Sequence, residues 1–188
     1  MMFLLFTLTA SASSLFEEKR SGVVLRLLAS PVSRVHILWS KYLYNMSLGF
    51  IQLCILFAFG ALLYKIDIIS NFFNLLIIVV AAATACAAFG MLLASISRTA
   101  AQANGLGTLL ILTMSSVGGA WFPTSFMPSY VQMFSKLTLV YWAMDGFLKV
   151  LWSGSGIIDI LPNIAILLSI AIVITLISIW QFKKGHVF

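Results

Sequence analysis

Long stretches without any charged side chain are the feature of this sequence that most constrains its fold. Four of them contain no Lys, Arg, Asp or Glu, at residues 42–64, 68–97, 99–135 and 160–182. A helix needs about 20 apolar residues to cross the hydrocarbon core of a bilayer. The first, second and fourth stretches each fit one such helix. The third is too long for one span, and because a glycine pair and two prolines follow residue 117, we predict that its span ends near Ala120.

The composition excludes a water-soluble domain. Of the 188 residues, 62% are hydrophobic and 9% are charged, whereas typical soluble domains carry about 25% charged residues. The 11 basic and 5 acidic side chains cannot cover a globule of this size, and so apolar a chain is not disordered either. We therefore predict an all-α integral membrane protein with a single transmembrane domain over residues 1–188. Its spans are expected at about residues 40–64, 70–96, 101–120 and 158–182.

The apolar run at residues 2–16 is short for a complete crossing. It has two interpretations, a signal peptide with a small-residue cleavage site near Ala12, or a partial span that begins inside a helix. The signal peptide lacks a positively charged start, and cleavage would leave a strongly basic segment outside the cell. We therefore expect a partial span, which brings the number of spans to about five.

The distribution of basic residues predicts the orientation in the membrane. If residues 17–41 are cytoplasmic, five alternating spans place eight of the 11 Lys and Arg side chains inside and three outside. Cytoplasmic loops of membrane proteins carry such an excess. The formal net charge of +6 is then explained by topology and by contact with anionic lipid, and indicates no nucleic-acid partner. The expected location is a cell membrane, which the chain crosses several times.

The basic segment at residues 17–39 is predicted to contain a short amphipathic helix. Val23, Val24, Leu27 and Leu28 recur at helical spacing. Arg20 and Arg26 lie off this apolar face, and Pro31 should end the helix. The pattern fits a membrane-surface anchor and a docking site for a protein partner equally well.

The segment at residues 121–156 is apolar but is broken by prolines and glycines. Irregular backbone exposed to lipid would leave amide groups without hydrogen bonds, at a cost of several kcal/mol each. Two short helices at the outer side of the membrane, re-entrant or interfacial, would avoid that cost. We favour the re-entrant form because the segment is too apolar for a solvated loop.

Motifs for catalysis or nucleotide binding are missing from the sequence. No Gly is followed by Lys, which excludes a Walker-type phosphate loop, and no H-E-x-x-H occurs. The predicted spans carry ionisable groups only near their ends, although a proton-driven pump usually needs a carboxylate inside the membrane. We therefore expect neither an enzyme nor a bound cofactor, and any active transport would take its energy from a partner.

Uncharged polar residues mark one predicted span. Asn104, Thr108 and Ser115 are spaced by four and seven residues, which places them on one face of the helix at residues 101–120. Such a face predicts either a helix interface or a water-accessible path. The alanine-rich run at residues 81–90 predicts close helix packing. These features alone also permit a passive channel, a secondary transporter, or a membrane anchor that recruits a cytoplasmic partner.

Three motifs resemble those of ABC type-2 transporter permeases. The sequence G-V-V-L-R-L-L-A-S-P-V-S-R at residues 22–34 is similar to the family's cytoplasmic motif, and F-P-T-S-F-M-P at residues 122–128 to its outer motif. W-A-M-D-G-F at residues 142–147 is similar to a stretch common in bacterial members. The sequence departs from the family pattern at Leu25, Ser125 and Leu139, and about five spans replace the usual six.

The resemblance implies a mechanism and assigns roles to residues. Family permeases dimerise, as homodimers or heterodimers, and each subunit binds an ABC-type ATP-binding subunit, which carries ATP and Mg, through a cytoplasmic coupling helix. The coupling helix would be supplied by Arg20, Gly22, Val24, Arg26, Leu27, Leu28 and Pro31. The substrate path between two copies would be lined by Asn104, Thr108 and Ser115. The extracytoplasmic gate would be formed by Phe122, Pro123, Met127 and Pro128. The resemblance thus implies an exporter permease in a bacterial cytoplasmic membrane.

Overall fold

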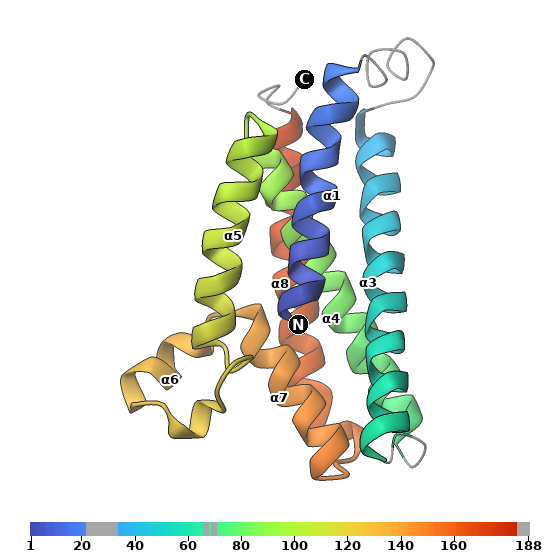
Figure 1. Ribbon diagram of the computed structural model, residues 1–188, viewed down its shortest axis with the longest axis vertical. Helices are drawn as coiled ribbons and strands as arrows, with labels where there is room; N and C mark the ends of the chain where they lie inside the picture. Colours follow the sequence, from blue (N-terminus) through green and yellow to red (C-terminus); the bar gives the residue numbers. More distant parts are fainter. Residues whose placement is uncertain (22–33, 66–67, 69–70, 184–188) are drawn as a thin grey trace.

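The computed structural model describes residues 1–21, 34–65, 68 and 71–183, and every regular element in these ranges is helical (Figure 1). In chain order the helices are α1 (Met2–Arg20), α3 (Arg34–Tyr64), α4 (Phe72–Ile96), α5 (Ala100–Val117), the 3₁₀ turn η1 (Thr124–Phe126), α6 (Ser129–Ser135), α7 (Leu139–Trp152) and α8 (Ile157–Lys183). Three of these helices are long and apolar enough to cross a membrane, over His36–Tyr64, Phe72–Ile96 and Ile157–Gln181. The predicted all-α membrane class is confirmed.

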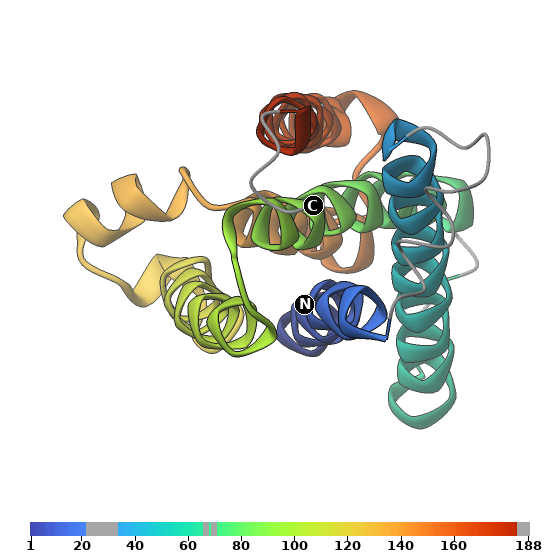
Figure 2. The same ribbon diagram turned by 90° about the horizontal axis from the view of Figure 1, so that it is seen from above.

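Helix α4 is the centre of the bundle. It packs most extensively against α8 and α3, and also against α1 and α7, and Figure 2 shows it between α8 and α1. In its most apolar window 72% of the residues are buried, against 11% in α3 and 22% in α8. Its small side chains explain this position, since Ala82, Ala83, Ala85 and Cys86 are fully buried and let neighbouring helices approach closely.

Helices α1 and α5 pair with each other beside α4. α1 has 19 residues and ends in four charged ones, and α5 has 18. Both fall at the positions of the two other predicted spans. That all five helices cross the bilayer stays a prediction.

Short polar and glycine signals set the ends of α5. Its N-cap is Thr99, whose side chain accepts a hydrogen bond from the Gln102 amide at 3.1 Å, while Gln102 Oε1 accepts one from the Arg98 amide at 2.8 Å. These bonds satisfy amide groups that a helix start leaves free. The helix stops at Gly118, and Gly119 follows with a φ of +87°, a conformation that glycine adopts without steric cost. The predicted end of this apolar run near residue 120 fits the helix end observed here.

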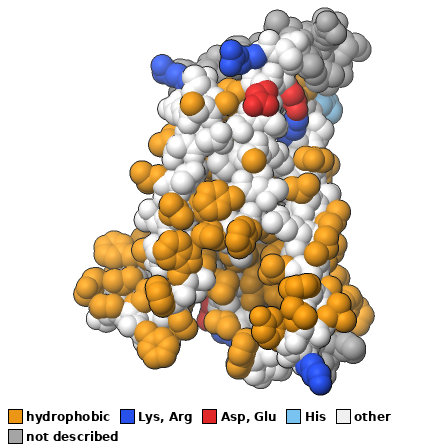
Figure 3. Space-filling view, viewed as in Figure 1, with side chains coloured by type: hydrophobic (Ala, Val, Ile, Leu, Met, Phe, Trp, Pro, Cys, Tyr) orange, Lys and Arg blue, Asp and Glu red, His pale blue; other side chains and the backbone are white. Residues whose placement is uncertain are grey.

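Charged side chains gather at the two ends of the bundle. In Figure 3, blue and red side chains cluster at the end where α1 finishes and α3 begins, and an orange belt of hydrophobic side chains occupies the region nearer the other end. α4 and α8 run between these two ends, and α5 begins at the first of them (Figure 1). This distribution is expected for a helix bundle whose middle lies in the hydrocarbon core and whose two ends lie in the polar headgroup regions.

The predicted orientation can be tested by labelling. A cysteine introduced by Ser33→Cys and one introduced by Ser153→Cys should react with a membrane-impermeant maleimide from opposite sides of the membrane, because residue 33 belongs to the predicted cytoplasmic segment. Intact cells and inverted vesicles, each carrying one variant in a background without Cys54 and Cys86, separate the two sides. Labelling of both variants from one side would contradict the five-span topology.

Candidate functional site

The two helices that flank the predicted coupling segment meet at the charged end of the bundle. α1 ends there at the exposed Arg20, and α3 starts there (Figure 1). Lys41 Nζ of α3 binds Glu18 Oε1 of α1 at 2.5 Å, and the two side chains are 30% and 34% exposed. The other coupling-helix residues predicted from the sequence lie outside the described residues: Gly22, Val24, Arg26, Leu27, Leu28 and Pro31. The coupling helix therefore stays a prediction. The ion pair between the two helices that flank it in the sequence is observed.

A stripe of polar side chains runs along each of α1 and α3, and the two stripes are joined by two bonds. On α1, Thr7, Ser11, Ser14 and Glu18 are spaced by four, three and four residues, which is one face of a helix. On α3, a second stripe is formed by Lys41, Asn45 and Gln52, spaced by four and seven residues. Two bonds join the stripes, the ion pair above and a hydrogen bond of 2.5 Å that Ser11 Oγ donates to Asn45 Oδ1. We call this contact, formed by Ser11, Glu18, Lys41 and Asn45, the polar seam.

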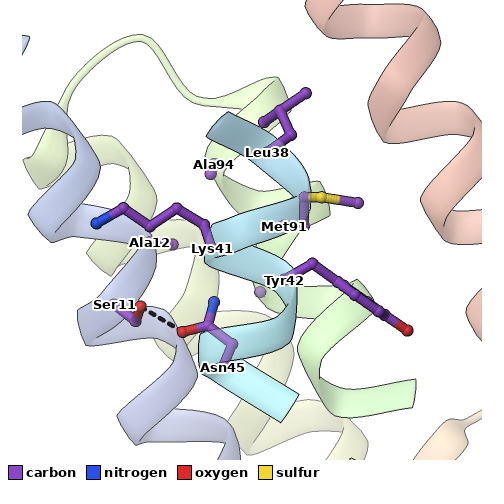
Figure 4. A pocket seen from close by; sticks show the side chains of 9 residues that line it. Ser11, Ala12, Leu38, Lys41, Tyr42, Asn45, Met91 and Ala94 are labelled. Carbon is purple, nitrogen blue, oxygen red and sulfur yellow. Dashed lines mark hydrogen bonds between the residues drawn. The ribbon is translucent and has the colours of Figure 1, made fainter. Parts of the chain in front are cut away.

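A small cavity accompanies the polar seam. Figure 4 shows the Ser11 and Asn45 side chains pointing toward each other at its wall, with Lys41 and Tyr42 nearby. Its volume is about 20 Å³, enough for a single water molecule. Gln52 lies on α3 about two helical turns beyond Asn45. Its buried Oε1 has no hydrogen-bond partner among the described residues. The seam is therefore a polar contact between two helices, with space for water beside it.

The sequence contained a signal for this seam that charge-based reasoning missed. Serine and threonine are frequent in membrane helices, so single ones on α1 are not informative. Their shared spacing with Glu18, and the matching spacing of Asn45 and Gln52 with Lys41, could have identified two polar faces. That these faces meet is known only from the fold.

The predicted pathway residues on α5 lie in two different environments. Asn104 and Thr108 are exposed, and Asn104 has no hydrogen-bond partner among the described residues. Ser115 is fully buried, and its Oγ also has no partner in the described part of the chain. Spacing grouped the three residues, but packing separates them, because α5 is covered near its end by the chain that leads into α7: a Cβ at Gly118 would meet Thr138 Oγ1 and Val140 Cβ, each at 2.8 Å.

The predicted gate residues surround a compact turn at the other end of the bundle. The amides of Phe126 and Met127 donate to the carbonyl oxygens of Pro123 and Thr124, at 3.1 and 3.0 Å. These bonds form η1, and Pro128 then caps α6. Phe122 is 67% exposed. A gate role for Phe122, Pro123, Met127 and Pro128 stays a prediction.

The two short helices of this outer segment differ in placement. α6 packs against α5 and η1 and projects sideways from the bundle (Figures 1 and 2), and Tyr130, Met133 and Phe134 on it are exposed. α7 packs inside the bundle against α8 and α4. Of the two forms considered from the sequence, the peripheral position of α6 fits the interfacial one better than the re-entrant one. Aromatic side chains favour that boundary.

A polar cluster fixes α7 to α8. Lys149 Nζ binds Asp145 Oδ2 at 2.7 Å, and their spacing of four residues places both side chains on one face of α7. Asn163 of α8 is fully buried beside them. Its Nδ2 donates to Asp145 Oδ2 at 2.8 Å and to the Trp142 carbonyl oxygen at 3.0 Å, and its Oδ1 accepts from Lys149 Nζ at 3.0 Å. Sequence reasoning missed Asn163, although a Pro–Asn pair at the start of an apolar span was a visible signal.

The surroundings of Tyr141 near this cluster disfavour its ionised form. Burial raises the pKa of its hydroxyl, and the nearby Asp145 carboxylate raises it further, while Lys149 acts in the opposite direction. A neutral phenol adds no charge to the cluster. This arrangement suits a structural joint between helices better than acid–base chemistry.

Comparison with known proteins identifies the family. The family model described as "ABC-2 family transporter protein" matches residues 1–180. The chain belongs to this family. This assignment agrees with the resemblance of three motifs in the chain to those of ABC type-2 permeases. The resemblance inferred from the sequence is therefore confirmed. The chain is thus a transport-type membrane protein built of helices.

One curated relative supports the assignment. The linearmycin resistance permease protein LnrN of Bacillus subtilis (strain 168) is 28% identical to the chain over 170 residues, which cover 90% of the chain and 44% of that relative. The chain therefore spans less than half the length of this relative. No solved structure gives a significant match.

Proposed function

We propose that the chain is the membrane subunit of an ABC exporter in a bacterial cytoplasmic membrane. A separate ABC-type subunit would bind and hydrolyse ATP, and two permease copies, identical or related, would form the substrate path. The observation that carries this proposal is the family match over residues 1–180 combined with a basic segment that joins α1 to α3 at one end of the bundle. LnrN is named as a resistance permease, which is consistent with export.

The charge distribution supports docking of a cytoplasmic subunit at that end. Arg20 and Arg98 are exposed there, at the end of α1 and in the turn before α5. Arg26 belongs to the segment between α1 and α3. Acidic groups on a partner would be attracted to this cluster, and such complementarity guides association and its specificity.

The exposed face of α5 supports a path between two copies. Asn104, Thr108 and Leu109 are exposed on it. An asparagine facing lipid would leave its amide without hydrogen bonds, which is costly in hydrocarbon. A second permease copy or a water-filled path next to α5 would provide hydrogen-bond partners for that amide. A dimer with a translocation path between its two subunits would provide both.

Capture of the ATP-binding subunit tests the proposal. Arg26→Glu, or Leu27→Asp, is expected to weaken capture of that subunit from detergent extracts at least tenfold, equivalent to about 1.4 kcal/mol, because charge reversal or a buried carboxylate opposes docking. Membrane insertion should persist. Lys65→Glu is the control, since it reverses a charge after the end of α3, at the opposite end of the bundle, and it should leave capture unchanged.

Unchanged capture by both coupling variants would remove the docking role of residues 22–30. Solute movement by the purified chain without any ATP-binding subunit would contradict the exporter proposal as a whole and favour a passive channel or a secondary transporter.

A further inference from the structure

A groove lies on the face of the bundle where α3 and α8 flank α4. Both helices pack extensively on α4, and Figure 2 shows α8 on the side of α4 opposite to α1. A cavity of about 230 Å³ there is lined by α3, α4 and α8, with Tyr42 and Thr84 in its wall. A second cavity, of about 300 Å³, is lined by α3 and α4. It includes Met46 and Val80, one helical turn away on each helix, so the two cavities adjoin. Together they form what we call the α3–α8 groove.

The inner surface of this groove favours an apolar occupant. The Tyr42 hydroxyl donates to the Thr84 carbonyl oxygen at 3.3 Å, and the Thr84 hydroxyl donates to the Val80 carbonyl oxygen at 2.6 Å. These two hydroxyl groups therefore already have acceptors. Aliphatic side chains surround them, and Val80 and Ile172 remain 39% and 60% exposed. Because the bilayer core contains no water, an open groove of this kind is filled by an apolar chain.

The side chains around the groove disfavour a further helix or a second copy as its occupant. Membrane helices approach each other through small side chains, but the rim carries the large, exposed Trp39, Ile172 and Leu176. The small Ala83 and Ala171 are buried beneath them. Two copies in one membrane share their orientation, so a symmetric contact through this face would bring equal charges at the groove end together. Like charges across an interface oppose association.

Basic residues end both helices that flank the groove. α3 begins at Arg34 and α8 ends at Lys183, and both positions lie at the charged end of the bundle (Figure 1). Two acidic residues, Glu17 and Glu18, also lie at this end, but both belong to α1, on the opposite side of α4 from α8 (Figure 2). Trp39 is 45% exposed near the start of α3, and indole rings favour the level of the lipid headgroups. This end of the groove therefore suits a negatively charged headgroup.

We propose that the α3–α8 groove binds an anionic phospholipid of the leaflet at the charged end of the bundle. One acyl chain lies in the groove along α4, and the phosphate is held near Arg34 and Lys183, with Trp39 at the headgroup level. The acyl chain alone does not select a lipid, because bulk hydrocarbon is as apolar as the groove. The two basic residues supply the preference for negative charge, and in the orientation predicted from the sequence this leaflet is the cytoplasmic one, which carries anionic lipids. The inference goes beyond the proposed function, since it needs no ATP-binding subunit.

Native mass spectrometry of the full chain tests the preference for charge. The chain is released from mild detergent that contains equimolar phosphatidylglycerol and phosphatidylcholine with the same acyl chains. We expect the phosphatidylglycerol adduct to exceed the phosphatidylcholine adduct at least threefold, and Arg34→Gln with Lys183→Gln to abolish this excess. Arg20→Gln with Arg98→Gln is the matched control, since it removes two exposed charges at the same end of the bundle but outside the groove helices, and it should keep the excess. Equal adducts of the two lipids, or equal losses in the two double variants, would overturn the inference.

Filling the groove tests the location of the lipid. Thr175→Phe adds a ring to the cavity wall and should lower the phosphatidylglycerol adduct at least threefold. Val173→Phe is the matched control, because Val173 is exposed on nearly the opposite face of α8, and it should leave the adduct unchanged.

A smaller substitution keeps this comparison valid for a variant that folds poorly. If Thr175→Phe lowers the helix content measured by circular dichroism, Thr175→Leu against Val173→Leu makes the same comparison. An adduct that filling leaves unchanged would overturn the inference. A dimer mass that the filling variant removes would also overturn it, because the groove would then belong to a contact with a second copy.

Discussion

Gly107→Leu is expected to force α1 away from α5 and to lower the free energy of unfolding by about 3 kcal/mol or more, the upper end of the cost of overpacking a closed interface. Gly107 packs directly against α1: a methyl group added there would overlap the Thr9 methyl and lie 3.3 Å from Leu93 Cδ1. Thr9 cannot turn away freely, since its hydroxyl donates to the Leu5 carbonyl oxygen at 2.9 Å and its side chain is 3% exposed.

Gly105→Leu is the matched control for this prediction. It lies two residues away on the same helix, and a side chain added there meets nothing within 4 Å. Both variants lose a helix-weakening glycine, so the gain in helix propensity, about 1 kcal/mol, cancels in the comparison. Unfolding in mixed micelles of detergent and SDS, followed by circular dichroism, measures the difference. Equal unfolding free energies for the two variants would show that α1 and α5 do not pack as described.

The helical class and the approximate helix positions could be predicted because lipid imposes simple rules. The charge-free stretches at residues 68–97 and 160–182 correspond to α4 and α8, since a spanning segment must satisfy its backbone internally and lack charges. The alanine-rich run predicted close packing, and α4 is the most buried of the long helices. Composition and local spacing are sufficient for such features.

The environment of individual polar residues could not be predicted in the same way. Spacing placed Ser115 with Asn104, but burial depends on which helix covers each turn of α5, and that depends on contacts far away in the sequence. Asp145 and Lys149 are four residues apart on one helix, a spacing that is visible in the sequence, whereas Asn163, which binds both, comes from another helix. Facing polar stripes on α1 and α3 were visible as periodicity, but their mutual contact required the fold.

Asn163→Leu is expected to loosen α7 from α8 and to lower the free energy of unfolding by about 2 kcal/mol. Leucine has nearly the same shape as asparagine, so the substitution removes hydrogen bonds with little change in packing. Three bonds are lost, to the Trp142 carbonyl, to Asp145 and to Lys149. Side-chain hydrogen bonds between membrane helices contribute about 0.6 kcal/mol each on average, which gives about 2 kcal/mol for the three.

Hydration of the remaining partners limits the size of this effect. Asp145 and Lys149 are 32% and 35% exposed and still pair with each other, so the loss of Asn163 does not leave an isolated buried charge, which would cost several kcal/mol. The Trp142 carbonyl also lies inside α7, where the helix ladder supplies a second partner.

Asn104→Leu makes the same chemical change on an exposed helix face and is the matched control. Because Asn104 has no hydrogen-bond partner among the described residues, its loss should leave the unfolding free energy of the monomer within about 0.5 kcal/mol of the parent chain. If Asn104 lines a path between two copies, the same variant should impair transport by the assembled permease. The two variants thus distinguish an asparagine that holds two helices together inside the bundle from one whose amide is exposed on the outer face of α5. An equal loss of unfolding free energy in Asn163→Leu and Asn104→Leu would refute that distinction.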